Sequence, residues 1–85
     1  MKEIQIGKVT HYYTRIGVGV LELSGELKVG DTIHIMGRIT DFIQPVGSIE
    51  IEHQKVETVG PGDEVALKVD EYVRAGDTVF KVVGE

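Results

Sequence analysis

The chain has 85 residues, of which 41% are hydrophobic and 27% are charged. These values are typical of one globular domain spanning residues 1–85, and they exclude a disordered or collagen-like chain. Fourteen acidic against nine basic residues give a net charge of −5, which on average repels a phosphate backbone. Cysteine is absent, so neither disulfides nor thiolate-bound zinc can supplement the apolar core.

The amino terminus lacks the long apolar run of a signal peptide. No stretch approaches the roughly 20 consecutive apolar residues of a membrane-spanning helix. We therefore expect a cytoplasmic protein.

Apolar residues recur along the chain with a period of two, as in Ile33 and Ile35 or in Val65 and Leu67. This alternation indicates half-buried strands, and no segment carries a convincing amphipathic helix. We expect strands near residues 3–12, 16–23, 32–38, 41–46, 48–58, 63–69 and 78–83.

Some of these strands change face midway. Ile4 and Ile6 share one parity, whereas Val9 and Tyr13 share the other, with Gly7 between them. Such a switch is typical of a β-bulge or a sharply coiled strand, and coiling lets a small sheet close on itself. The pattern predicts an all-β fold, a small closed antiparallel β-barrel of about six to seven strands with Greek-key connections.

Gly-Asp pairs recur where strands are expected to begin. Glycine permits a positive φ, and an Asp carboxylate can accept backbone N–H groups that a turn leaves unpaired. We interpret these pairs as structural turns rather than as ligand sites. They are Gly30 with Asp31, Gly62 with Asp63, and Gly76 with Asp77.

Three segments carry a resemblance to a known family. They are residues 27–33 (Leu-Lys-Val-Gly-Asp-Thr-Ile), 60–67 (Gly-Pro-Gly-Asp-Glu-Val-Ala-Leu) and 73–79 (Val-Arg-Ala-Gly-Asp-Thr-Val). With the glycine-rich second strand, they resemble the β-barrel second domain of translation GTPases such as elongation factor Tu. A similar barrel ends the chains of collagenase-like peptidases, and small proteins called translation elongation factor-like are also similar.

The resemblance implies the barrel fold over about residues 4 to 83. It also implies a partner that is transfer RNA, ribosomal RNA, or a translation or RNA-modification protein. The chain has no Gly-x-x-x-x-Gly-Lys-Ser/Thr motif, so GTP hydrolysis is not carried over. The peptidase portion of the collagenase-like proteins is missing too.

The segment between the first two expected strands is rich in aromatic and basic residues. Aromatic rings offer stacking faces for unpaired bases, and Arg15 can pair with phosphate or stack on a ring. The alternative is that Tyr13 packs as a lid on the barrel and Arg15 is only solvated. The candidate binding residues are Lys8, His11, Tyr12, Tyr13, Arg15 and Arg38.

Three histidines raise the question of a metal site, because imidazole is a common zinc ligand. His34 lies between two isoleucines and should face outward, whereas His53 continues the apolar parity of Ile49 and Ile51. The two should therefore point to opposite faces. Together with His11 they predict no metal site, and we expect no cofactor.

Catalytic residues are not evident in the sequence. Ser24 and Ser48 lack a neighbouring base, and Glu50 and Glu52 alternate with isoleucines as the exposed face of a strand would. We expect a binding module that is not an enzyme and that docks on RNA or on a translation or RNA-modification protein. Two alternatives are a small enzyme and a biotin or lipoate carrier, whose closing strands residues 70–79 resemble although no Met-Lys-Met or Asp-Lys-Ala triplet is present.

Overall fold

The computed structural model describes residues 2–84, and strands are the only regular elements there. No helix among these residues is long and apolar enough to cross a membrane. The ten strands are β1 (Lys2–Tyr13), β2 (Val18–Leu23), β3 (Leu27–Lys28), β4 (Thr32–Met36), β5 (Asp41–Pro45), β6 (Ile49–Ile51), β7 (Gln54–Val56), β8 (Thr58–Val59), β9 (Glu64–Lys68) and β10 (Thr78–Val83). The all-β prediction is confirmed.

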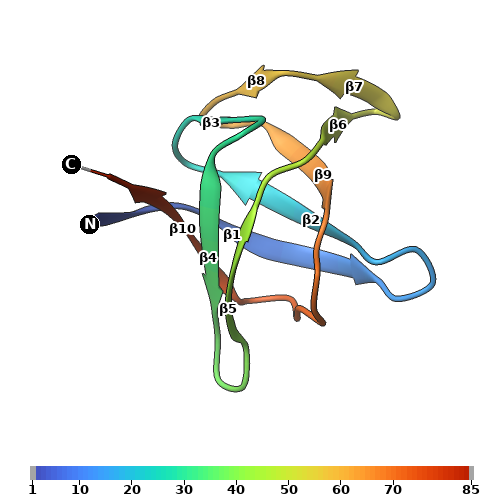
Figure 1. Ribbon diagram of the computed structural model, residues 1–85. Coiled ribbons are helices and arrows are strands. Elements are labelled where there is room, and N and C mark those ends of the chain that lie inside the picture. The colour runs from blue at the N-terminus through green and yellow to red at the C-terminus, as the bar shows by residue number, and fades with distance from the viewer. Residues whose placement is uncertain (1, 85) are drawn as a thin grey trace.

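Eight of the strands form one antiparallel sheet in the order β5-β4-β10-β1-β2-β9-β6-β7, while β3 pairs with β8. The sheet curls around the core, and β1 and β10, the first and last strands of the chain, pair side by side within it, so that the two chain ends lie close together (Figure 1). The prediction of a closed barrel of about six to seven strands is wrong, because the backbone ladder ends at β5 and β7. Pro45 ends β5 and has no N–H to donate, so the ladder is not extended there.

A side chain spans the seam that the ladder leaves open between β5 and β9. The side-chain amide nitrogen of Gln44 donates to the carbonyl of Lys68 at 2.9 Å, and its oxygen accepts from the N–H of Asp70 at 2.6 Å. Gln44 is only 3% exposed. Because a buried polar group that lacks a partner is costly, these bonds tie β5 to the end of β9.

The change of face expected in β1 is confirmed, and it occurs twice. The register with β10 shifts between Gln5 and Gly7, and the register with β2 shifts between Val9 and His11. A β-carbon on Gly7 would lie 2.5 Å from the carbonyl oxygen of Glu22, so glycine permits the close approach of β1 and β2.

The second shift reverses the expected orientation of the two tyrosines in β1. Tyr12 packs against the core, whereas Tyr13 points outward and is 50% exposed. The neighbouring strand β2 does not change face, because Gly19, Leu21 and Leu23 are all buried on one side of it. The interpretation of Tyr13 as a lid is therefore wrong, since the additional residue in the bulge exchanges the two faces of the strand.

The core consists of aliphatic side chains and one phenylalanine, all less than 9% exposed. One of these side chains, Val73, lies in the connection between β9 and β10, so this connection is anchored by packing. The fully buried members are Ile6, Val9, Leu21, Leu27, Ile33, Ile35, Ile49, Val65, Val73 and Val79.

The three Gly-Asp turns share one geometry. In each, the glycine has a φ near +90°, namely 99° at Gly30, 89° at Gly62 and 98° at Gly76. In each, the aspartate accepts the N–H of the residue three positions earlier, at 2.9 to 3.0 Å. Its own N–H donates back to the carbonyl of that same residue. The aspartates are Asp31, Asp63 and Asp77.

Replacing Gln44 tests the side-chain closure of the seam. Gln44→Ala leaves the carbonyl of Lys68 and the N–H of Asp70 without their partner, so we expect the free energy of unfolding to fall by about 2 to 4 kcal/mol. Urea denaturation measures this change. The exposed Gln54 of β7 supplies the control, and Gln54→Ala should change the same quantity by less than about 0.5 kcal/mol. Equal losses in the two variants would contradict the role of the seam.

Candidate functional site

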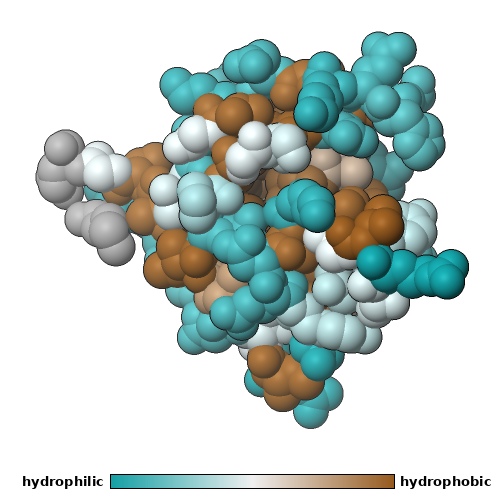
Figure 2. Space-filling model, turned by 45° about the vertical axis from the view of Figure 1, so that its right-hand side comes forward, coloured by the Kyte–Doolittle hydropathy of each residue, from teal (hydrophilic) through white to brown (hydrophobic). Residues whose placement is uncertain are grey.

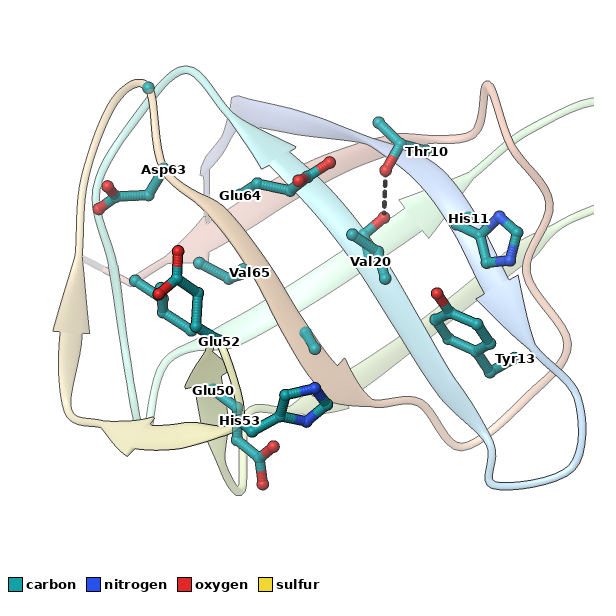
Figure 3. A pocket seen from close by; sticks show the side chains of 13 residues that line it. Thr10, His11, Tyr13, Val20, Glu50, Glu52, His53, Asp63, Glu64 and Val65 are labelled. Atoms are coloured by element: carbon teal, nitrogen blue, oxygen red, sulfur yellow. Dashed lines mark hydrogen bonds between the residues drawn. The ribbon is translucent and has the colours of Figure 1, made fainter.

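The sheet carries an open groove on its outer face, across β1, β2, β9 and β6 (Figure 3). Its volume is about 740 Å³. His11 and Tyr13 point into it from β1, their ring centroids 4.4 Å apart. We call it the outer groove; it is lined by Thr10, His11, Tyr13, Val20, Glu50, Ile51, Glu52, His53, Gly62, Asp63, Glu64, Val65 and Ala66.

Carboxylates dominate the charge of the outer groove. Glu64 lies on β9, Glu50 on β6, and Glu52 in the turn between β6 and β7. None of the three forms an ion pair with a basic side chain of residues 2–84. The carboxylate of Asp63 already accepts the N–H of Gly60 within its own turn. The groove therefore carries negative charge on its β6 and β9 side and the two rings of His11 and Tyr13 on its β1 side (Figure 3).

The residues selected from the sequence do not form one patch. His11 and Tyr13 line the outer groove, but Tyr12 lies on the opposite face of β1 against Tyr72, with ring centroids 4.7 Å apart. Lys8 is exposed on β1 opposite Glu22 and lines a separate hollow. Arg15 and Arg38 occupy the turns after β1 and β4. Tyr12 and Tyr13, which were predicted to belong to one binding segment, therefore point to opposite faces of β1.

Two residues outside that selection join Tyr12. The guanidinium of Arg74 lies over the ring of Tyr72, 4.6 Å from its centroid, and donates to the hydroxyl of Thr40 at 3.3 Å. Residues 70–74 form an irregular connection rather than closing strands. Arg74 is not among the binding residues that the sequence predicts. The signal that could have revealed it is that Arg74, like Arg15, falls between two expected strands.

His34 lies apart from the outer groove and bridges three strands. Its Nδ1 lies 2.8 Å from Glu3 of β1, and its Nε2 lies 2.6 Å from Asp41 of β5. The hydrogen bond to Asp41 raises the pKa of His34 above its ordinary value, and Glu3 adds to this effect, against the opposing effect of burial. Two carboxylate partners favour the imidazolium form, in which both ring nitrogens donate.

The other histidines lie elsewhere. His53 occupies the turn after β6 with a φ of 67° and is exposed, so the inward orientation expected for it is wrong. The reason is that β6 ends at Ile51, before the alternation reaches His53. Within residues 2–84, no group of three or more His, Asp and Glu side chains is arranged to hold a metal ion.

The fold is shared with a domain of a peptidase. The C-terminal domain of a Geobacillus thermoleovorans protein assigned to the U32 peptidases superposes with a TM-score of 0.88, covering 94% of this chain and 93% of that domain at 20% identity. A selenomethionine variant of the same domain gives a TM-score of 0.84. The chain thus has the fold of a U32 peptidase C-terminal domain.

Two curated proteins are similar in sequence. An uncharacterized protease of Methanocaldococcus jannaschii is 39% identical over 80 residues, which are 93% of this chain and 20% of that protein. A collagenase of Porphyromonas gingivalis is 39% identical over 82 residues, again 20% of its length. The chain therefore spans about a fifth of the length of these relatives. No family model matches the sequence.

These matches correct two expectations. The resemblance to collagenase-like peptidases is confirmed, whereas the assignment as a translation elongation factor-like protein is wrong. The expectation that the protein is not an enzyme is contradicted, because the relatives are named protease and collagenase, of which this chain spans about a fifth. The Gly-Asp turns at the starts of strands are typical of this barrel-like fold. They do not distinguish between the protein families that share the fold, so they could not exclude a translation factor.

The bridge formed by His34 predicts a pH-dependent stability. A histidine whose pKa is raised by folding contributes stability that is fully present below the unfolded value of 6.5 and is lost as pH rises through the folded pKa. The difference in unfolding free energy between the wild type and His34→Asn should therefore shrink from pH 6 to pH 9, by less than about 1 kcal/mol. Thermal unfolding at each pH measures it. His53→Asn is the matched control, and a difference for His34→Asn that is constant across this range would contradict the bridge.

Proposed function

We propose that this chain serves a peptidase as a polypeptide-binding domain. The observation that carries the proposal is the match to the Methanocaldococcus jannaschii protease, which includes nearly the whole of this chain and a fifth of that protein. A domain of about 85 residues that forms one part of a much longer protease can bind a polypeptide while another part of the protease cleaves it. The proteins named collagenase that match in the same way support this assignment.

The outer groove is the surface that suits such a ligand best. Its volume of about 740 Å³ is within the range of ligand sites, and it lies open along the sheet instead of enclosing a cavity. An extended polypeptide can lie along an open groove of this kind. Tyr13 offers an aromatic contact, and aromatic side chains are favoured where proteins bind one another.

The charge of the groove selects the kind of segment. Glu50, Glu52 and Glu64 lack ion-pair partners among residues 2–84, so lysine or arginine side chains of a ligand can pair with them. Complementary charge speeds the encounter and selects among partners more than it adds affinity. We therefore assign to the outer groove polypeptide segments that carry basic side chains.

RNA binding remains a prediction from the sequence. The net charge of −5 opposes a phosphate backbone, and the candidate residues are distributed over separate surfaces. Titration with transfer RNA at two salt concentrations tests it, since binding through phosphates weakens steeply with salt.

Neutralising the groove tests the proposed function. We expect an unfolded lysine- and arginine-rich peptide to bind the wild type and to bind the double variant Glu50→Gln, Glu64→Gln about fivefold more weakly, because two ion pairs are removed. Fluorescence anisotropy measures the affinity. The matched control is Glu26→Gln, Glu57→Gln, which removes two exposed carboxylates outside the groove. No binding by the wild type, or equal weakening in both double variants, would contradict the proposal.

A further inference from the structure

Three loops lie at one end of the curled sheet, two of them as turns that project in different directions (Figure 1). They are the β1–β2 turn (residues 14–17), the β4–β5 turn (residues 37–40) and the β9–β10 connection (residues 69–77). The N–H of Val69 donates to the carbonyl of Gly17 at 3.0 Å, and Arg74 of the third loop donates to Thr40 of the second. The third loop thus lies between the other two and joins them (Figure 1).

Each of the two turns presents an exposed Arg-Ile pair at its tip. The pairs are Arg15 with Ile16 and Arg38 with Ile39, and we call them the arginine tips. Ile16 is 59% exposed and Ile39 is 74% exposed. The lower tip of the molecule, where the β4–β5 turn lies, carries apolar surface in Figure 2. Large aliphatic side chains at protruding tips are costly in water unless something covers them.

The apolar surface of this end is larger than the tips alone. Seven large hydrophobic side chains of the described residues are exposed, and four of them, apart from Tyr13 of the outer groove, lie in these loops or at an adjoining strand end. Such a gathering of exposed apolar side chains marks an interaction surface. The four are Ile16, Met36, Ile39 and Tyr72.

The charge of the tips defines the partner. The two turns contain no acidic residue, whereas the connection between them carries the exposed Asp70 and Glu71. Neither Arg15 nor Arg38 forms an ion pair with a carboxylate of residues 2–84, so both guanidinium groups are available to a partner. Arginine, tyrosine and methionine are enriched at protein interfaces, and arginine and tyrosine often dominate their energies. Apolar tips suit a protein partner better than a phosphate backbone, which carries no apolar complement.

From this geometry we infer that the arginine tips, with Tyr72 between them, bind an acidic polypeptide segment that carries large apolar side chains. The carboxylates of the segment pair with Arg15 and Arg38, while its apolar side chains cover Ile16 and Ile39. About four fifths of the length of the matched relatives lies outside the region similar to this chain. Resting on the proposed function, we place the segment in that remaining part of a peptidase, so that the tips attach the domain while the outer groove holds substrate.

Peptide titration tests the inference directly. The probe is a labelled peptide of about 12 residues that repeats Glu-Leu-Asp-Phe. We expect it to bind the wild type and to bind Arg15→Glu, Arg38→Glu at least about tenfold more weakly, because charge reversal at two central arginines repels the segment. A second variant, Ile16→Ser, Ile39→Ser, removes only the apolar cover and should also weaken binding.

The control variant reverses two exposed lysines away from these loops, Lys28→Glu and Lys55→Glu, and should keep the wild-type affinity within about twofold. Unchanged binding of the acidic peptide by both tip variants, or no binding at about 1 mM peptide, overturns the inference. So does capture of the tips by a lipid vesicle, a short RNA or a second copy of the chain in place of the peptide. Tip variants should still bind the basic peptide in the outer groove, so failure here leaves the proposed function standing.

Discussion

The hydrogen bonds of one buried glutamine close the gap in the sheet that backbone pairing leaves open. Backbone pairing runs from β5 to β7 and stops, and Gln44 joins β5 to the end of β9 through its side-chain amide. A glutamine can do this because its amide both donates and accepts. The N–H of Asp70, which it binds, begins the connection that carries Tyr72 and Arg74. The same contact therefore closes the fold and fixes the loops at one end.

That closure gives the small domain two distinct surfaces. One is the outer groove across β1, β2, β9 and β6, where Glu50, Glu52 and Glu64 lie on the side of β6 and β9, and His11 and Tyr13 lie on the side of β1. The other is the end of the sheet with the three loops, where the exposed isoleucines and arginines lie. In the proposed function, the first surface holds substrate and the second attaches the domain to the remaining part of a peptidase.

The sequence allowed the strands and turns to be predicted because their causes are local. Alternation at Ile33 and Ile35 and the Gly30–Asp31 turn depend on neighbours within a few residues. The seam could not be predicted, since Gln44 in an alternating strand is indistinguishable from an exposed glutamine until β9 is placed against it. The orientation of Tyr12 and Tyr13 depended on a bulge at a position without glycine, which periodicity alone does not locate. The grouping of Arg15, Arg38 and Arg74 at one end likewise depended on tertiary closure.

Amide hydrogen exchange at Asp70 tests the closure most directly. If the Gln44 side chain holds that N–H, its exchange in the folded protein should be slow and comparable to that of the amides in the centre of β9. Residue-resolved exchange followed by nuclear magnetic resonance measures this rate. An Asp70 amide that exchanges as fast as those of an exposed loop would show that the seam opens freely, and would contradict a fold closed by Gln44.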